Sequence, residues 1–288
     1  MRYLVPNRLD EALGFLAAEP VRLLAGGTDF YPALGDRPIF TAAQADPVMD
    51  ITGLTALRGL SREERDGGAV WRIGALTSWS DIVRAKLPAA FDGLKAAARE
   101  VGSLQIQNAA TVVGNLCNAS PAADGVPPLL TLEASLELSS QSGTRVVPLA
   151  EFITGVRQTV RRPDELVTAL LLPCLPAQAR SSFVKLGARR YLVISIAMVS
   201  VLLLPDGQGK VSQARIAVGS CSAVAQRLSA LETALTGLDW SAAALTPRVT
   251  SDLLRPLRPI DDIRGSAAYR LAAAEELICR ALSSCLGK

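Results

Sequence analysis

The spacing of apolar and polar positions divides the chain into two parts, each with helices and strands. Up to residue 175, apolar positions at helical spacing predict helices at 9–18, 79–85, 91–101 and within 121–132. In the same part, short apolar runs bounded by glycine, proline and polar residues predict strands at 21–25, 48–51, 69–75, 135–138, 145–149 and 165–172, with a polar turn near 62–68. This mixture predicts an α+β fold.

The second part begins after a stretch at 176–182 that resembles a linker. Apolar runs predict a three-stranded antiparallel sheet with strands at 183–186, 191–204 and 210–220. Helices are predicted after the sheet, at 224–235, 247–254 and 267–286. The chain of 288 residues exceeds one typical domain of about 100–200 residues. We therefore predict domains at 1–175, with subdomains of about 1–55 and 56–175, and at 180–288.

Charge and hydropathy restrict the kinds of partner. Thirty Lys and Arg against 27 Asp and Glu give a net charge of +3 without a long basic block, which gives nucleic-acid binding little support. The run 191–204 is interrupted by Ser195 and Ser200 and is shorter than the roughly 20 residues of a membrane-spanning helix. Asp10 and Glu11 precede any apolar segment of a secretory signal, so we expect a cytoplasmic protein.

The inventory of histidine and cysteine excludes several kinds of catalysis. The chain has no histidine, which excludes a Ser-His-Asp triad, histidine-ligated zinc and a histidyl-linked flavin. Its five cysteines form no C-x-x-C pair and have neither zinc nor iron–sulfur spacing. We therefore expect the chemistry to come from a bound cofactor.

Two glycine turns are candidates for binding that cofactor. Gly26-Gly27-Thr28-Asp29 follows a predicted strand, and glycine allows backbone N–H groups to converge on an anion such as a pyrophosphate. A plain tight turn is the alternative. The second turn, Gly114-Asn115, lies in a stretch that alternates apolar residues with Asn108, Thr111, Asn118, Ser120 and Asp124. Neither G-x-G-x-x-G nor G-x-x-x-x-G-K-[ST] is present, so a dinucleotide site outside the Rossmann and P-loop classes is predicted.

Three motifs resemble the flavoprotein subunit of the molybdenum hydroxylases, the family of xanthine dehydrogenase and aerobic carbon monoxide dehydrogenase. They are LAGGTD at 24–29, TVVGNLCNASPAAD at 111–124 and DDIRGSAAYR at 261–270. The resemblance spans nearly the whole chain. It implies a two-subdomain FAD-binding fold of the vanillyl-alcohol oxidase and p-cresol methylhydroxylase type, followed by a smaller α+β C-terminal domain with an antiparallel sheet and helices.

The resemblance also implies roles for single residues. Backbone amides and hydroxyls of two segments would bind the pyrophosphate of FAD: Leu24, Ala25, Gly26, Gly27, Thr28, Asp29 and Phe30, then Thr111, Val112, Val113, Gly114 and Asn115, with Asn118 and Ser120 extending the cradle. Asp124 would bind a sugar or ribityl hydroxyl. Val101, Leu166 and Val167 would lie near the cofactor.

Other matches to the family have a structural alternative. Lys185 corresponds to a lysine near the isoalloxazine ring, or is a solvated lysine at a strand end; Tyr191 would stack near the ring, or simply pack. Arg264 and Arg270 are expected to hold the last helix to the sheet, with a subunit contact as the alternative for Arg264. Val113 stands where the family has a glycine, and because a β-branched residue resists positive φ, we expect altered geometry or affinity there.

The function implied is that of an FAD-carrying electron-transfer subunit. FAD would be bound non-covalently, while molybdopterin would lie on a large partner subunit and [2Fe–2S] clusters on a small one. Electrons would pass from the clusters through the flavin to NAD or another acceptor. The alternatives are a stand-alone FAD oxidoreductase, with Lys185, Tyr191 or a carboxylate as its acid or base, and an assembly scaffold without activity.

Overall fold

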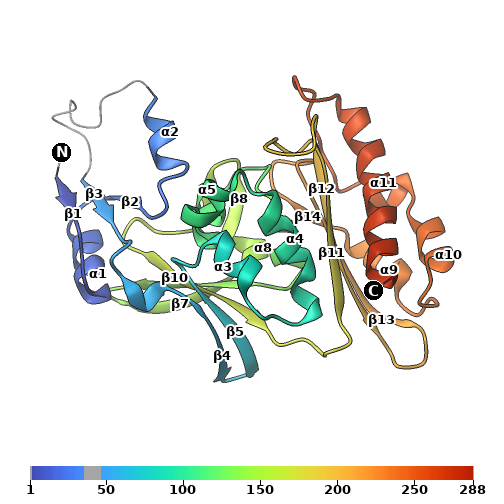
Figure 1. The fold of residues 1–288 in the computed structure, drawn as a ribbon, viewed down its shortest axis with the longest axis horizontal. Helices are drawn as coiled ribbons and strands as arrows, with labels where there is room; N and C mark the ends of the chain where they lie inside the picture. The colour runs from blue at the N-terminus through green and yellow to red at the C-terminus, as the bar shows by residue number, and fades with distance from the viewer. Residues whose placement is uncertain (1, 36–46, 288) are drawn as a thin grey trace.

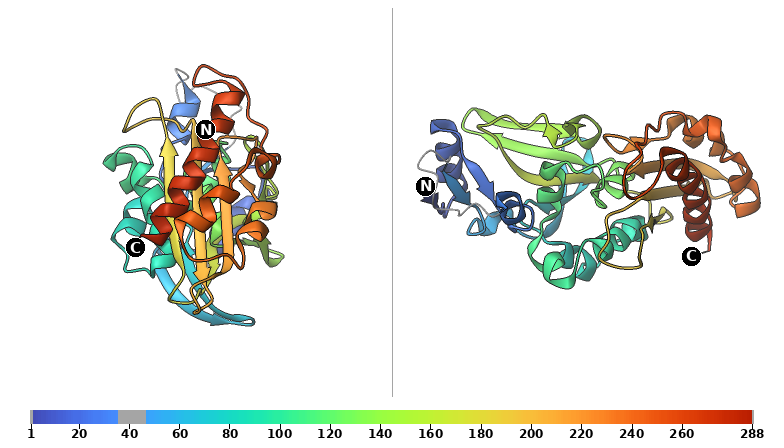
Figure 2. Two further views of the ribbon diagram at one scale, coloured as in Figure 1. Left: turned by 90° about the vertical axis from the view of Figure 1, so that its right-hand side faces the viewer. Right: turned by 90° about the horizontal axis from the view of Figure 1, so that it is seen from above.

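The computed structural model describes residues 2–35 and 47–287. The chain progresses along the longest axis of the molecule, from a small N-terminal sheet through a central sheet flanked by helices to a C-terminal sheet covered by α11 (Figures 1 and 2). The predicted α+β class is confirmed. None of the described helices is both long enough and apolar enough to span a bilayer.

The N-terminal part is a three-stranded parallel sheet with order β1-β3-β2. Its elements are β1 (Tyr3–Leu4), α1 (Leu9–Ala18), β2 (Arg22–Leu24), α2 (Phe30–Leu34) and β3 (Val48–Asp50). Helix α1 has the predicted bounds and buries Ala12, Leu13 and Leu16. Since β2 ends at Leu24, which is buried, the first glycine turn begins at the carboxyl end of β2.

The central sheet is antiparallel, with order β4-β5-β10-β6-β7. Its strands are β4 (Leu60–Arg65), β5 (Gly68–Gly74), β6 (Ser135–Ser140), β7 (Gly143–Pro148) and β10 (Leu166–Pro173). The polar turn predicted near 62–68 is wrong, because most of it is strand β4. An edge strand pairs on one side only, so a run of Arg and Glu can form it. Its Glu63 lies 3.9 Å from Arg72 of β5, and its Arg65 lies 2.9 Å from Glu137 of β6.

Helices and short strands connect the sheets and line the site. They are η1 (Thr55–Leu57), α3 (Trp79–Arg84), η2 (Ala89–Phe91), α4 (Asp92–Glu100), α5 (Leu104–Ala109), α6 (Val112–Asn118), α7 (Val126–Thr131), α8 (Leu149–Phe152), β8 (Ile153–Gly155) and β9 (Gln158–Thr159). The prediction of a glycine turn at Gly114-Asn115 is wrong. Gly114 lies inside α6, whose start is fixed because the Thr111 hydroxyl accepts a hydrogen bond of 3.0 Å from the Gly114 N–H.

The C-terminal sheet is antiparallel and has four strands rather than the three predicted. Its elements are β11 (Arg180–Leu186), β12 (Ala197–Pro205), β13 (Val211–Gly219), β14 (Gln226–Arg227), α9 (Ser229–Leu235), α10 (Ala242–Leu245), η3 (Thr246–Arg248), η4 (Ser251–Leu254) and α11 (Ala267–Leu286). Helix α11 has the predicted bounds. The helix predicted at 224–235 begins only at Ser229, because β14 precedes it, and the one at 247–254 is replaced by two 3-10 turns.

The C-terminal sheet is covered on both faces. On one face, Val199, Val201 and Ile216 pack in a cluster with α9 and α11. On the other face, Leu202 and Ala217 belong to the cluster that fills the central part. Helix α4 contacts β11, where the Gly93 N–H donates to the Ser181 hydroxyl at 2.8 Å. The segment between β10 and β12 is therefore held against the central helices.

Candidate functional site

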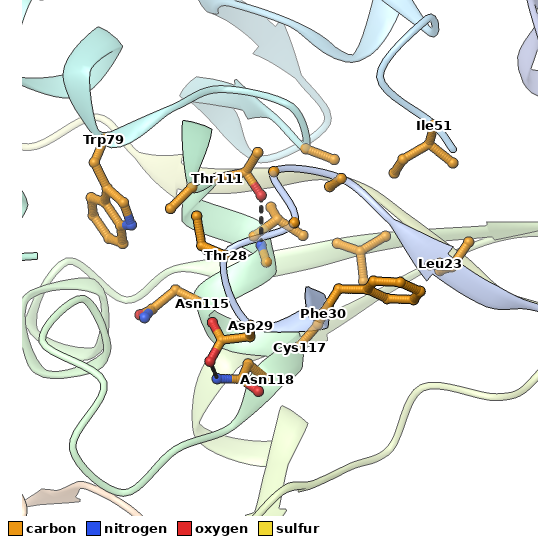
Figure 3. A pocket seen from close by; sticks show the side chains of 18 of the residues that line it. Leu23, Thr28, Asp29, Phe30, Ile51, Trp79, Thr111, Asn115, Cys117 and Asn118 are labelled. Atoms are coloured by element: carbon orange, nitrogen blue, oxygen red, sulfur yellow. Dashed lines mark hydrogen bonds between the residues drawn. The ribbon is translucent and has the colours of Figure 1, made fainter. Parts of the chain in front are cut away.

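A cavity of about 600 Å³ lies between the first glycine turn and helix α6 (Figure 3). Its wall contains most of the residues predicted from the two motifs and the nearby strands: Ala25, Gly26, Gly27, Thr28, Asp29, Phe30, Val101, Thr111, Val113, Gly114, Asn115, Asn118, Leu166 and Val167. The volume is in the range of small-molecule sites. The fold thus brings together segments that are more than a hundred residues apart in sequence.

The remaining predicted residues do not line this cavity. Leu24 and Val112 are buried in the core, Ser120 accepts a hydrogen bond from the Ala122 N–H, Asp124 and Lys185 pair with each other, and Tyr191 is 61% exposed. Tyr191 therefore lies at the surface. The proposed roles of these residues toward FAD stay predictions.

The first glycine turn is packed on the segment that precedes α6. A Cβ atom at Gly26 would lie 2.0 Å from the carbonyl oxygen of Ala109, and Gly27 has a φ of +74°. The backbone N–H groups of Gly26, Gly27 and Thr28 donate no hydrogen bond to any atom of residues 2–35 and 47–287. These three donors at the cavity wall are suited to an anion such as a pyrophosphate.

Helix α6 forms the opposite wall. Val113 lies in its first turn and is not among the residues with positive φ, so the backbone there does not disfavour a β-branched side chain. The expected change in affinity stays a prediction. The side chain is 5% exposed and contributes to both the core and the cavity wall. A valine is therefore compatible with this wall.

Asp29, Asn118 and Arg157 hold three segments together at one side of the cavity. The Asn118 amide donates to the Asp29 carboxylate at 2.8 Å, as Figure 3 shows, and the Arg157 guanidinium donates to the Asn118 amide oxygen. Arg157 also lies 3.9 Å from Asp29. This cluster connects the first glycine turn, the end of α6 and the β8–β9 hairpin.

Two buried polar atoms in the cavity wall have no hydrogen-bond partner among the residues that the structure describes. They are Nε1 of Trp79, whose side chain is fully buried, and Oδ1 of Asn115. A buried donor or acceptor without a partner costs about 1–3 kcal/mol. Both atoms therefore fit a site whose ligand has polar groups of its own.

A second hollow of about 510 Å³ adjoins the cavity, since Val101, Ile106 and Asn115 line both. Its wall also contains Asp124 and the segment 192–194. The Asp124 carboxylate accepts hydrogen bonds of 2.6 Å from the Lys185 ammonium and from the Ser195 hydroxyl. Burial raises the pKa of Asp124, while Lys185 and Ser195 act in the opposite direction.

The cavity is also lined by residues that were not predicted to bind the cofactor: Leu23, Ala33, Ile51, Ala75, Trp79, Ile106, Ala110, Cys117 and Arg161. Most are apolar residues that sequence reasoning assigns to the core. The start of α3 was recognisable from Ser78 and Asp81, which form a capping box around Trp79. The Cys117 thiol is unsuited to nucleophilic chemistry, because burial raises its pKa to about 11.

Arg270 of the last motif has the structural role expected of it, whereas a subunit contact of Arg264 stays a prediction. The buried Arg270 guanidinium donates to the carbonyl oxygens of Ile196 and Ser220, at 2.5 and 3.2 Å, and to the Asp262 carboxylate at 2.6 Å. Arg264 also pairs with Asp262, at 3.1 Å. These contacts fix α11 to the ends of β12 and β13.

Two sequence families match the chain. The family described as "FAD binding domain in molybdopterin dehydrogenase" matches residues 1–175, and the family described as "CO dehydrogenase flavoprotein C-terminal domain" matches residues 182–285. A putative xanthine dehydrogenase FAD-binding subunit of Escherichia coli K12 is 30% identical over 285 residues, which are 96% of this chain and 92% of that protein.

Two further comparisons extend this similarity. The nicotinate dehydrogenase FAD-subunit of Eubacterium barkeri is 34% identical over 205 residues, which are 67% of this chain and 65% of that protein, slightly less than two thirds of its length. A chain in the structure of carbon monoxide dehydrogenase from Hydrogenophaga pseudoflava has a TM-score of 0.86 and 28% identity, with 100% of this chain and 97% of that chain covered. The predicted fold, an FAD-binding part followed by a smaller α+β part, is confirmed.

Proposed function

The chain belongs to the family of FAD-binding subunits of molybdenum hydroxylases, and we propose that it transfers electrons from iron–sulfur clusters on a partner subunit to an acceptor at its own flavin. The observation that carries the proposal is the cavity between the first glycine turn and α6, whose wall has three N–H donors without an acceptor in the described part of the chain. Bound FAD would supply both one-electron and two-electron chemistry there.

The chain's own residues would bind and orient the cofactor. The backbone N–H groups of Gly26, Gly27 and Thr28 would donate to the pyrophosphate, and the hydroxyls of Thr28 and Thr111 lie in the same wall. Val101, Leu166 and Val167 would exclude water from the flavin ring. The clustered side chains of Asp29, Asn118 and Arg157 would keep the glycine turn against α6.

Two further predicted residues would act beside the cavity: Asp124, which lines the adjoining hollow, and Lys185, which pairs with it. Lys185 is held by Asp124, so its ammonium has a fixed position from which it could influence the charge of the flavin ring. Asp124 would have to combine this pairing with a hydrogen bond to a ribityl or sugar hydroxyl. A carboxylate oxygen can accept a second hydrogen bond, so the two roles are compatible.

The iron–sulfur and molybdopterin centres would lie on partner subunits. No group of three or more potential metal ligands from His, Cys, Asp and Glu occurs in the described residues. Relatives are named as a medium subunit of nicotine 6-hydroxylase and as medium chains of carbon monoxide dehydrogenase and glyceraldehyde dehydrogenase, which supports a multi-subunit assembly. We therefore propose a large molybdopterin-binding partner and a small [2Fe–2S] partner.

The domain division and the location belong to the same proposal. The cluster between the C-terminal sheet, α9 and α11, whose residues all follow residue 180, and the limits of the two matching families support domains at 1–175 and 180–288. The five cysteines are all free thiols, which favours a reducing compartment and hence the cytoplasm. NAD is the acceptor proposed first, with oxygen and other carriers as alternatives.

The test is to purify the tagged full-length chain from cells that also produce its partners, and to identify what accompanies it. The proposal expects FAD that acid releases into solution, one large molybdopterin-binding protein and one small [2Fe–2S] protein. Mixing the complex with its reducing substrate and then NAD, or oxygen alone, identifies the acceptor. A chain that is purified alone with FAD and oxidises a small molecule by itself would instead establish the stand-alone oxidoreductase.

A further inference from the structure

Trp79 and Asn115 place an unpaired donor and an unpaired acceptor in the same region of the cavity wall. The indole Nε1 of Trp79 is buried and donates to no described atom of the protein, and the Asn115 Oδ1 accepts from none. Figure 3 shows both side chains toward one end of the cavity, whereas Leu23 and Ile51 lie toward the other. The end with Trp79 and Asn115 therefore has buried polar atoms without a partner among the described residues, and the other end is largely apolar.

The chemistry of these two atoms restricts what they can bind. A phosphate oxygen can accept from the Trp79 N–H, but an ionised phosphate has no hydrogen to donate to the Asn115 oxygen. A hydroxyl can both donate and accept, so a chain of hydroxyl groups satisfies both atoms. FAD has hydroxyls on its ribityl chain and on its ribose.

We propose that Trp79 and Asn115 are positioning residues that bind the sugar or sugar-alcohol hydroxyls of the cofactor. The Trp79 N–H donates to one hydroxyl oxygen, and the Asn115 side-chain oxygen accepts from a hydroxyl. This inference rests on the proposed function, because it requires FAD in this cavity. It adds Trp79, which lies outside all three motifs, to the residues that orient FAD.

Both side chains are held by well-defined backbone elements. Trp79 is the first residue of α3, which has a capping box formed by Ser78 and Asp81, and the backbone N–H of Trp79 donates to the Ala110 carbonyl oxygen at 3.2 Å. Gly125 leaves room for the indole, since a Cβ there would lie 2.4 Å from Cη2 of Trp79 and 3.0 Å from the Asn115 oxygen. Asn115 lies in α6. A site on such elements is preorganised, so binding costs little reordering of the side chains.

The experiment measures the dissociation constant of FAD for the full-length chain, within its complex if the isolated chain does not retain the cofactor. Trp79→Phe keeps an aromatic ring but removes the N–H, and Asn115→Leu keeps the approximate shape but removes the acceptor. Each is expected to raise Kd about tenfold, which corresponds to about 1.4 kcal/mol. Trp240→Phe, in the C-terminal part, is the matched control and should leave Kd unchanged.

Smaller ligands separate hydrogen bonding from packing. If the ligand is the ribityl chain, wild type should bind riboflavin more tightly than lumiflavin, which lacks that chain. If the ligand is the ribose, wild type should bind ADP more tightly than 2′-deoxy-ADP. Trp79→Phe should reduce whichever preference wild type shows. Loss of the first preference identifies the ribityl chain as the ligand and loss of the second identifies the ribose, and either supports the proposal. If both variants bind FAD within about twofold of wild type, the proposal is wrong.

Folding and function failures remain distinguishable in this design. Far-UV circular dichroism and thermal unfolding show whether each variant folds. If Trp79→Phe does not fold, the Kd of Asn115→Leu alone tests the proposal, because Asn115 lies on the surface of α6 that faces the cavity. If wild type binds no FAD even in the assembled complex, the proposed function itself fails and this inference with it.

Discussion

Lys185 and Asp124 form a buried ion pair in which the ammonium nitrogen lies 2.6 Å from a carboxylate oxygen. Their side chains are only 7% and 8% exposed. Asp124 follows α6 in the central part, whereas Lys185 belongs to β11 of the C-terminal sheet. Ser195 donates to the other carboxylate oxygen, so one carboxylate joins α6, β11 and the segment before β12. The pair thus fixes the second hollow next to the cofactor cavity.

Asp124→Asn should destabilise the protein strongly. It removes the negative charge and leaves the buried Lys185 ammonium without a counter-ion, which typically costs about 3–5 kcal/mol. The measurement is urea unfolding of wild type and variant at pH 7. Asp124→Leu combined with Lys185→Met removes both charges and should recover most of the loss, because apolar replacement of a whole buried pair is often neutral. A single variant as stable as wild type would show that the pair is not buried in solution.

Gly26→Ala should impair FAD binding. The new Cβ would lie 2.0 Å from the Ala109 carbonyl oxygen, a backbone atom that cannot move alone, so the glycine turn must separate from the segment before α6. We expect Kd for FAD to rise about 100-fold, or ~2.7 kcal/mol. The matched control is Gly53→Ala, whose Cβ would meet its nearest atom, the Pro6 carbonyl oxygen, at 3.5 Å. Equal affinity of Gly26→Ala and Gly53→Ala for FAD would contradict the assignment of this turn.

The motifs were sufficient to predict which segments form the cavity, but not its complete lining. Glycine, threonine and asparagine in apolar surroundings mark a ligand site because an ordinary core avoids them, and this signal led to Gly26, Thr111 and Asn115. Trp79 gives no such signal, since a tryptophan in an apolar segment is usually a core residue. Its unpaired Nε1 becomes visible only when the neighbours of α3 are known.

Val113→Gly should lower stability without improving FAD binding. Val113 is 5% exposed in the first turn of α6, so the substitution removes buried apolar surface and introduces a poor helix former. The expected loss is about 2–3 kcal/mol in the free energy of unfolding. Titration with FAD checks affinity, and Val112→Ala, a core change outside the cavity wall, is the control. Tighter FAD binding by Val113→Gly would show that the valine does obstruct the cofactor.

The errors in the predicted fold have physical causes that sequence patterns do not contain. Strand β4 carries Arg and Glu at positions that local propensity assigns to a turn, but pairing with β5 satisfies its backbone. The strand predicted at 191–204 begins only at Ala197, since Leu192 has a φ of +53° and the Ser195 side chain is bonded to Asp124. In both cases a distant partner overrides the local pattern.

Glu165 is the clearest source of acid sensitivity near the cavity. Its carboxylate is buried, accepts hydrogen bonds of 2.6 and 2.9 Å from the Arg145 guanidinium, and accepts a third of 2.8 Å from the Arg162 N–H. The hydrogen bond from Arg145 is the main cause that lowers the pKa of Glu165 below its ordinary value of 4.5. Glu165 directly precedes β10, which supplies Leu166 and Val167 to the cavity wall.

Glu165→Gln should therefore destabilise the protein in a pH-dependent way. Because the pKa is lower in the folded state, the ionised carboxylate contributes its full stabilisation above pH 4.5, and this contribution is lost as the pH falls through the folded-state pKa. Arg145 is about a third exposed, so we expect a loss of about 1–2 kcal/mol at pH 7. In urea unfolding from pH 7 to 3, the difference in free energy of unfolding between wild type and Glu165→Gln should stay constant down to about pH 5 and then shrink.

The control is Glu276→Gln, which removes an exposed pair with Arg280. Its free energy of unfolding should differ from that of wild type by less than about 0.5 kcal/mol at every pH. A difference between wild type and Glu165→Gln that grows toward acid pH would contradict the assignment.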